Sequence, residues 1–384
     1  MAHGQQRSAA WRATESLLGA IIGVGVFGLP FVFVRAGFFV GLAYLVVLGL
    51  VMMTIQLMLG EVVLQTPGHH RIPGLVTRYF GKKWGAVAAV VTVGSAWGAL
   101  VAYVLIGGLF VHALLSPMIG GGVFLYQLGF LVVGFLVSLN GLRAVTRTET
   151  YMVWAMIVAM LVIIGRGLFG AEASAFTLVD GWNVLLPYGV VLFALSGLTT
   201  IPELKDVLGR HKASLRTVIP VAMIVVVVLY ALFAAAVVGV TGSETTPEAV
   251  IGLGRALGSW VLVVGSIFGF LAVATSFLFQ AVIIQDLVEY DYGLSRLGAW
   301  FVALLLPTII LLGGWRDVIE VMGITGGLFG GLIGAFVAAL YIRVKSRRCG
   351  GPHECFYIKN GWAVAVFALF LIGAVMETIF AILR

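Results

Sequence analysis

Long apolar runs alternate along this chain with short charged or turn-rich breaks, and the pattern predicts a membrane-embedded helical bundle. A helix needs about 20 consecutive apolar residues to cross a bilayer, and eleven runs approach or exceed that length. The predicted spans are residues 14–34, 38–64, 84–115, 122–140, 149–168, 182–202, 214–240, 256–287, 297–312, 316–342 and 362–383. We therefore expect an all-α integral membrane protein with about 11 transmembrane helices joined by short loops.

Composition agrees with this pattern. Of the 384 residues, 61% are hydrophobic and only 10% are charged, whereas soluble proteins average about 45–50% and 25%. These values exclude a soluble enzyme, a disordered chain and a receptor with a large domain outside the membrane. The net charge of +7 is read as basic cytoplasmic loops rather than as a nucleic-acid surface, so no nucleic-acid partner is expected.

The distribution of basic residues predicts the orientation of the chain. With a cytoplasmic N-terminus, 18 of the 23 Lys and Arg residues fall on the cytoplasmic side, as the positive-inside rule requires. Residues 1–13 then form a cytoplasmic tail and the C-terminus lies outside. The first span is expected to be a retained helix rather than a cleaved signal peptide, because no cleavage site follows it.

Glycine is unusually abundant, with 51 residues, and two predicted helices are interrupted by glycine and proline. The first helix contains residues 21–30 (IIGVGVFGLP), and the sixth contains residues 187–189 (PYG) and 196–202 (SGLTTIP). Each is the first helix of a set of five. Helices 1–5 occupy residues 14–168 and helices 6–10 occupy residues 182–342, while helix 11 (362–383) lies outside both sets. Since five is odd, the second set is inverted, and matched interruptions of this kind indicate a transporter binding site.

Unwound backbone can bind a ligand directly. Freed amides near Gly23, Val24 and Gly25 suit a carboxylate at a helix N-terminus. Freed carbonyls suit an ammonium group, and on helix 6 they belong to Phe193, Ala194, Leu195 and Ser196. A zwitterion would use both sets. The alternative for helix 1 is close helix packing, because Gly19 and Gly23 have the Gly-x-x-x-Gly spacing.

Several segments together resemble the amino acid/auxin permease family, including its bacterial aromatic amino acid permeases, within the amino acid-polyamine-organocation superfamily. These segments are residues 21–30, 36–38 (AGF), 73–83 (PGLVTRYFGKK) and 272–278 (AVATSFL), with Glu61 and Asp286. The resemblance implies a LeuT-type fold, a 5+5 inverted repeat with discontinuous helices 1 and 6. It also implies a substrate site between helices 1, 3, 6, 8 and 10 and a location in the cell membrane, the inner membrane of a bacterium.

The resemblance further implies a sodium site. Its ligands would be Gly19 and Ile22 on helix 1 and Ala272, Thr275 and Ser276 on helix 8. Oxygen ligands without a carboxylate suit a weakly held monovalent cation rather than a divalent one. The alternative is ordinary hydroxyl bonding between helices. Proton coupling competes with sodium, although helix 5 lacks the lysine that some relatives place in this position, and that absence slightly favours sodium.

Three other side chains are singled out. The resemblance assigns Glu61 to support of unwound backbone, with a proton site or a solvated surface charge as alternatives. Tyr103 is expected to meet the substrate carboxylate, or else to be a plain interior tyrosine. Glu377 is expected to be an exposed charge near the end of helix 11. The presumed pocket contains no charged side chain, which favours a neutral amino acid.

The resulting hypothesis is a secondary active transporter of neutral amino acids that works by alternating access and is coupled to a cation. A channel, an embedded enzyme, and a proton-coupled aromatic amino acid permease or exchanger remain as alternatives. No catalytic residue, cofactor or transition metal is expected, and the one implied ion is sodium. Cys349, His353 and Cys355 match no standard zinc spacing. The sequence leaves open the identity of the amino acid, symport against exchange, and the oligomeric state.

Overall fold

Helices account for nearly all of the structure. The computed structural model describes residues 2–139, 149–177, 183–348 and 358–383, and no strand occurs in these ranges. The α-helices are α1 (Ala2–Ile21), α2 (Gly25–Ala36), α3 (Phe38–Gln65), α4 (Ile72–Phe80), α5 (Lys82–Ile119), α6 (Val123–Ser138), α7 (Glu149–Phe169), α8 (Leu186–Ala194), α9 (Ile201–Leu208), α10 (Leu215–Thr241), α11 (Val250–Leu257), α12 (Ser259–Tyr292), α13 (Arg296–Leu312), α14 (Val318–Gly323), α15 (Gly331–Arg348) and α16 (Asn360–Leu383). Short 3₁₀ helices are η2 (Ala173–Phe176), η4 (Leu198–Thr200), η5 (Gly209–Ser214) and η6 (Gly242–Glu244), and η7 (Ile324–Gly330) is a π-helix.

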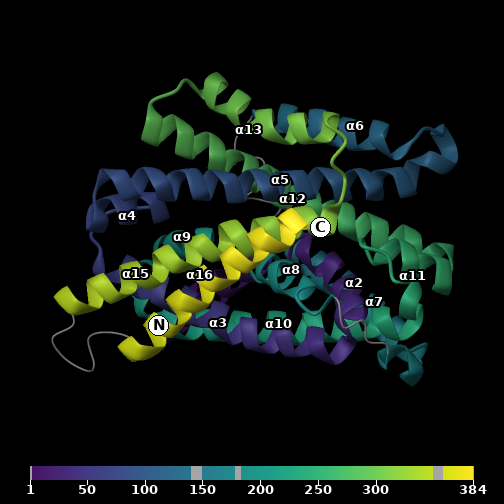
Figure 1. Ribbon diagram of the computed structural model, residues 1–384, viewed down its shortest axis with the longest axis horizontal. Helices are drawn as coiled ribbons and strands as arrows, with labels where there is room; N and C mark the ends of the chain where they lie inside the picture. The colour runs from purple at the N-terminus through teal and green to yellow at the C-terminus, as the bar shows by residue number, and fades with distance from the viewer. Residues whose placement is uncertain (1, 140–148, 178–182, 349–357, 384) are drawn as a thin grey trace.

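The long helices lie side by side in one bundle (Figure 1), and each predicted span contains helix. Six helices of the described chain are long and apolar enough to cross a membrane, and the bent pair α1 and α2 makes a seventh span. Shorter apolar helices occupy predicted spans 4, 5 and 9, while span 6 contains α8, η4 and the first two residues of α9. The protein is therefore a multi-pass membrane protein.

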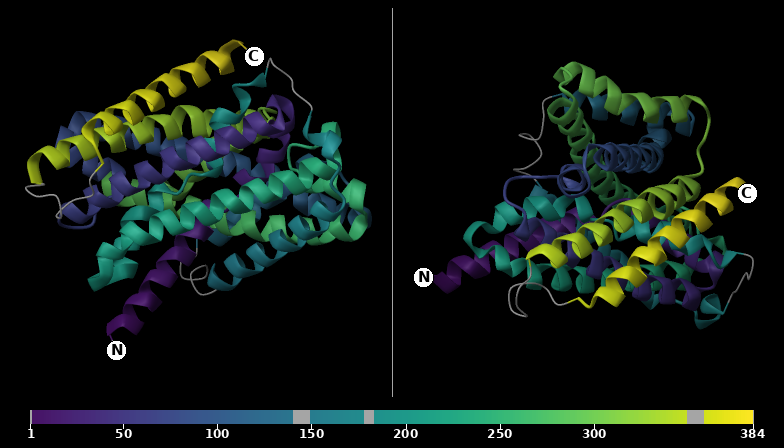
Figure 2. Two further views of the ribbon diagram at one scale, coloured as in Figure 1. Left: turned by 90° about the horizontal axis from the view of Figure 1, so that it is seen from below. Right: turned by 60° about the vertical axis from the view of Figure 1, so that its left-hand side comes forward.

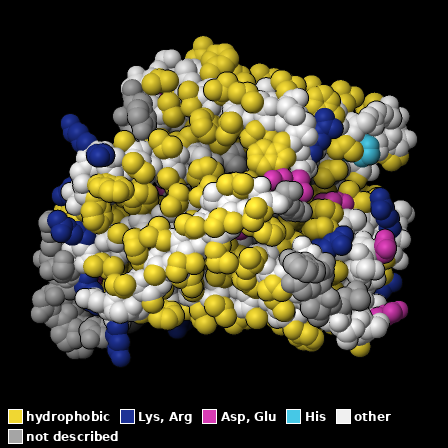
Figure 3. Space-filling view, in the orientation of Figure 1, with side chains coloured by type: hydrophobic (Ala, Val, Ile, Leu, Met, Phe, Trp, Pro, Cys, Tyr) yellow, Lys and Arg dark blue, Asp and Glu magenta, His cyan; other side chains and the backbone are white. Residues whose placement is uncertain are grey.

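Its surface agrees with this assignment. Figure 3 shows hydrophobic side chains over the middle of the bundle, with Lys and Arg gathered toward its two ends. Such a belt is what lipid requires of the outer face of a helical membrane protein. Apolar side chains that are more than half exposed, such as Phe39, Val90 and Met118, are thus explained by the bilayer.

The structure adds elements that the apolar pattern did not predict. Helix α1 already begins at Ala2, although residues 2–13 were expected to be only a tail. Helix α4 lies in an expected loop; it has Pro73 in its first turn and ends at Gly81, and nine residues are too few to register as a span. Helix 10 contains the π-helix η7 between α14 and α15. Cys349, His353 and Cys355 lie outside the described residues.

Two breaks interrupt spans in the bundle. Helix 1 ends at Ile21 and resumes at Gly25, and its halves meet at 55°. Pro30 is not the breaking residue, since it lies inside α2. Helix 6 ends at Ala194 and continues through η4 into α9. Figure 2 shows α1 extending beyond the rest of the bundle. Residues 22–24 (Ile-Gly-Val) therefore form the first interruption.

Glycines let the broken helices approach their neighbours. A methyl group built on Gly25 would lie 2.5 Å from Ala194 Cα, which joins α2 to α8. One on Gly189 would lie 2.4 Å from the carbonyl oxygen of Gly323, and one on Gly326 would lie 2.1 Å from that of Gly189. Helices 1, 6 and 10 therefore pack backbone against backbone, which only residues without a side chain permit.

This packing predicts the effect of a single methyl group. Gly189→Ala is expected to lower the free energy of unfolding by about 1–3 kcal/mol, because the added Cβ overlaps the backbone of Gly323. Thermal unfolding of the purified protein in detergent measures the loss. The control is Gly129→Ala in α6, where no atom lies within 4 Å of the added methyl group. Equal melting temperatures for the two variants would contradict the packing argument.

Candidate substrate and cation site

A cavity of about 120 Å³ lies between the two interrupted helices. It is lined from α1 and α2, α5, α8 and the segment after it, α12 and η7. Of the thirteen residues predicted to bind substrate or cation, eleven line this cavity: Gly19, Ile22, Gly23, Val24, Gly25, Tyr103, Phe193, Ser196, Ala272, Thr275 and Ser276. Residues separated by more than 250 positions in the sequence thus face one small space.

The other two predicted residues do not line the cavity. Ala194 packs against Gly25, and its carbonyl accepts a hydrogen bond from Tyr230. Leu195 is fully buried, and its amide donates to the carbonyl of Val191. Both are turned toward the protein interior, because the last turn of α8 closes on itself before the chain unwinds. Ser196 is the exposed residue of this segment.

The start of α2 gives the cavity an electropositive end. Val24 occupies the N-cap position and provides no side-chain cap, so amides of the first turn of α2 point along the helix dipole toward the cavity. Two hydroxyls stand beside them: a methyl group on Gly23 would lie 3.4 Å from Ser276 Oγ and 3.8 Å from the Tyr103 hydroxyl. Tyr103 and Ser276 both line the cavity. This end of the cavity suits a carboxylate.

The predicted cation ligands Ala272, Thr275 and Ser276 lie on α12, the eighth predicted span, and line the cavity together with the end of α1. Thr275 donates its hydroxyl hydrogen to the carbonyls of Leu271 and Ala272, at 3.0 Å each. Its oxygen lone pairs thereby remain available to a positively charged ligand. Gly19 and Ile22 line the same cavity from the end of α1. The five residues that the resemblance assigned to a cation thus line one space.

The cavity has an uncharged lining, and a cluster of phenylalanine side chains lies beyond one of its ends. Among its described lining residues none is acidic, basic or a histidine. Beyond the break, Phe27 is fully buried, and its ring lies 5.1 Å from Phe110, 5.5 Å from Phe268 and 6.2 Å from Phe233 between centroids. This phenylalanine cluster fills the bundle on the α2 side. On the α1 side the lining continues instead, to Ser16, Thr199 and Gln280.

Sequence reasoning missed Tyr230 of α10. Its hydroxyl donates toward two carbonyls, at 3.0 Å to Ile21 and at 3.2 Å to Ala194. These carbonyls belong to the last residues of α1 and α8, so one buried phenol joins the two breaks. The available signal was a lone tyrosine in the apolar run 221–240, since a phenol buried in a membrane needs a partner.

Glu61 is buried, with 1% of its surface exposed. It receives a hydrogen bond from Gln65 at 3.0 Å and an ion pair from Arg216 at 3.6 Å. Glu61 does not line the cavity and instead attaches α3 to the first turn of α10. Its predicted role as a support for unwound backbone stays a prediction.

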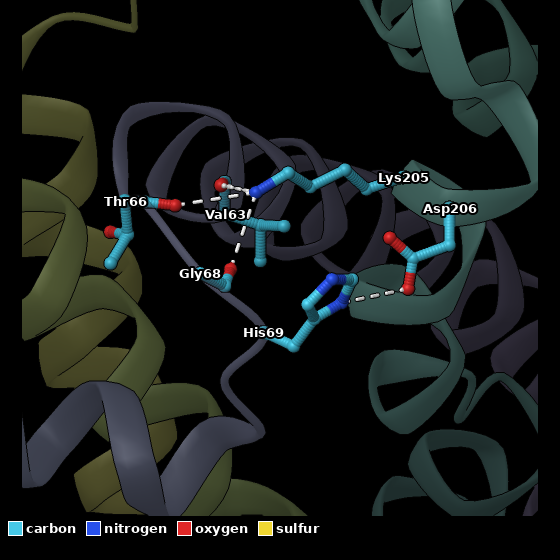
Figure 4. Close-up of polar contacts among 6 residues, drawn as sticks. All are labelled: Val63, Thr66, Gly68, His69, Lys205 and Asp206. Carbon is cyan, nitrogen blue, oxygen red and sulfur yellow. Dashed lines mark hydrogen bonds and ion pairs between the residues drawn. The ribbon is translucent and has the colours of Figure 1, made fainter.

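Hydrogen bonds from Lys205 attach α9, the second half of helix 6, to the end of α3 (Figure 4). Lys205 of α9 donates to the carbonyls of Val63, Thr66 and Gly68, at 3.2, 3.3 and 3.5 Å, where α3 ends. A lysine at a helix C-terminus also complements the helix dipole. Beside it, His69 Nδ1 lies 3.1 Å from Asp206 Oδ2. Helix α9 is therefore attached to α3.

Comparison with known structures defines the class of the fold. The chain resembles MhsT, a transporter of the LeuT fold whose crystal structure was determined in complex with L-phenylalanine, with a TM-score of 0.68 and 14% sequence identity. The match covers 96% of this chain and 98% of MhsT. The predicted fold class, an all-α LeuT-type bundle of inverted five-helix repeats with helices 1 and 6 broken, is confirmed. The exact repeat boundaries stay predictions.

The family follows from the sequence. Residues 7–379 match the tryptophan/tyrosine permease family, and the chain belongs to that family. It is accordingly a transporter and not an enzyme. No curated protein matches the chain. In the part of the chain that the structure describes, no three His, Cys, Asp or Glu side chains are grouped as metal ligands.

The bridge at Tyr230 leads to a prediction. Tyr230→Phe leaves two buried carbonyls without the hydroxyl, at a cost of about 1–3 kcal/mol, and is expected to weaken ligand binding because the two breaks lose their common partner. Isothermal titration with an amino acid ligand measures the affinity. Tyr126→Phe, which removes a hydroxyl bonded to the Gly120 carbonyl outside the cavity, is the control. A similar affinity in both variants would show that Tyr230 does not organise the site.

Proposed function

We propose that this protein is a secondary active transporter that moves an aromatic amino acid across the cell membrane by alternating access. The observation that carries the proposal is the uncharged cavity between the two interrupted helices. On one side it meets the uncapped start of α2, and on the other the chain that leaves α8. A zwitterion matches both helix ends without any charged side chain.

The aromatic preference has three supports. The family is named for tryptophan and tyrosine permeases, and the similar structure of MhsT contains L-phenylalanine. In this chain, Tyr103, Phe193 and Phe279 line the cavity, and aromatic rings favour edge and offset contacts with another ring. The absence of charge from the described lining disfavours acidic and basic amino acids, whose side chains would be desolvated without a counter-ion.

Alternating access is supported by the unequal ends of the cavity. The phenylalanine cluster around Phe27 packs the α2 side, while the lining extends along α1 to Ser16. With the N-terminus in the cytoplasm, as the basic residues predict, the cavity of this conformation extends toward the cytoplasm and is sealed from the outside. The C-terminus then lies outside the cell.

A cation is the proposed driving ion, and sodium is favoured over the proton. Its ligands would be the carbonyls of Gly19, Ile22 and Ala272 with the hydroxyls of Thr275 and Ser276. All five residues line the substrate cavity, so a cation there would be close to the substrate. Hydroxyl and carbonyl ligands alone suit a monovalent ion.

Binding of amino acids tests the proposal directly. Purified protein is expected to be stabilised against thermal unfolding by tryptophan, tyrosine or phenylalanine, and not by lysine or glutamate, because only a ligand that binds the folded state raises its melting temperature. Uptake of the same amino acids into proteoliposomes follows, with a sodium gradient and a pH gradient imposed separately. If no aromatic amino acid binds under any of these conditions, the proposal fails.

The cation site has its own test. Thr275→Ala combined with Ser276→Ala is expected to abolish the dependence of uptake on sodium, because both side-chain oxygens of the proposed cage are removed. Uptake measured against sodium concentration reports this loss. Thr308→Ala in α13 removes a hydroxyl with the same bond to the carbonyl four residues earlier and is expected to change nothing. An unaltered sodium dependence in the double variant would exclude the site.

A further inference from the structure

Glu377 of α16 is placed differently from the exposed end-of-helix charge that the sequence suggested. It is half-buried against helix 10. A methyl group built on Gly323 would lie 2.7 Å from Glu377 Oε1, and one built on Gly327 would lie 2.6 Å from its Cγ and 2.9 Å from Oε2. Gly323 and Gly327 are four residues apart and share one helix face. The carboxylate thus occupies a notch that exists because neither residue has a side chain.

The opposite side of this helix segment contacts the substrate site. Thr325 and Gly326 line the cavity, and Gly326 packs against the backbone of Gly189 and Phe193 in α8. Thr325, Gly326 and Gly327 all belong to the π-helix η7. Such wider turns are frequent at functional sites, since they are less regular than an α-helix and rearrange more easily. Glu377 and the substrate cavity therefore contact the same short segment of helix 10, which is an element that can change its packing.

Helix 6 also contacts α16 close to Glu377. Tyr188 of α8 lies against Gly373, one turn before Glu377, since a methyl group on Gly373 would overlap its hydroxyl. Glu377, Tyr188 and Tyr44 of α3 line a second cavity of about 430 Å³. These two tyrosines are the other titratable groups among its described lining residues. In helix 10 itself, η7 has none, and Glu320 of α14 accepts a hydrogen bond from the Trp315 indole.

We propose that Glu377 is a proton-binding site whose occupancy sets the packing of helix 10 against α8. The ligand is a proton from solvent, which converts the carboxylate into a neutral carboxyl group. A neutral carboxyl group is far less costly at membrane depth than a charged one. Proton binding therefore stabilises the tight junction of α8, helix 10 and α16, whereas proton loss draws water to it and loosens α8. The inference rests on the transport function proposed above, and it makes transport respond to pH even when sodium drives it.

Infrared difference spectroscopy and uptake together test the proposal. The purified full-length protein is compared between acidic and alkaline buffer, and a protonated-carboxyl band is expected that disappears in Glu377→Gln. Glu320→Gln, the control, keeps the band. In proteoliposomes with a fixed sodium gradient, Glu377→Gln is expected to lose the pH dependence of aromatic amino acid uptake, while Glu320→Gln keeps it. A band that persists in Glu377→Gln, or a pH profile that this variant leaves unchanged, overturns the proposal.

Two more variants distinguish the loss of a proton-binding group from a loss of folding. Glu377→Asp keeps a carboxyl group, withdrawn by one methylene, and is expected to keep a shifted band and a shifted pH profile. Gly327→Ala fills the notch and is expected to shift both the infrared band and the pH profile of uptake. If this variant leaves the band and the profile unchanged, the packing of helix 10 does not depend on the protonation of Glu377. If the wild-type protein transports no aromatic amino acid, the transport function fails. The infrared comparison then still decides whether Glu377 binds the proton.

Discussion

The contact between the two interrupted helices is the constraint on which the rest of this structure depends. Broken helices in a membrane expose backbone groups that lipid cannot satisfy. Here Gly25 lets α2 lie directly on Ala194, and the Tyr230 hydroxyl binds the carbonyls that end α1 and α8. The hydroxyl thus satisfies two carbonyls that face the protein interior. The polar groups that remain at the breaks are those that face the cavity, so the chain assembles a polar site from peptide groups.

The low charge and high glycine content of the sequence then have one explanation. Because helix ends provide the polarity of the cavity, its described lining needs no ionised side chain. Because helices 1, 6 and 10 meet through their backbones, they need glycine at the contacts, as at Gly25, Gly189 and Gly326. Glycine thus has two separate uses here, in unwinding helix 1 and in close packing. The structure contains both uses.

Much of the architecture followed from sequence because lipid imposes simple rules. Span length and composition predicted the bundle. The paired glycine and proline interruptions pointed to five of the residues that line the cavity, and the family resemblance pointed to six more. The features that the sequence did not predict have no periodic signal. Whether Ala194 and Leu195 face the cavity depends on how the last turn of α8 closes. The roles of Tyr230 and Glu377 depend on which distant backbone each one meets, and η7 differs from an α-helix only in hydrogen bonding.

The halves of each broken helix are attached to different neighbours, and this difference favours movement at the breaks. Helix α9 is attached to α3 through Lys205, whereas α8 packs on helix 10 through Gly189. Likewise α1 contacts α7, where the Trp154 indole donates to Glu15, whereas α2 lies on α8. When one set of attachments shifts relative to the other, we expect residues 22–24 and 195–197 to absorb the rotation, because the α-helices are interrupted there. Residues 22–24, 196 and 197 line the cavity, so a ligand bound there contacts both sets at once and can bias their arrangement.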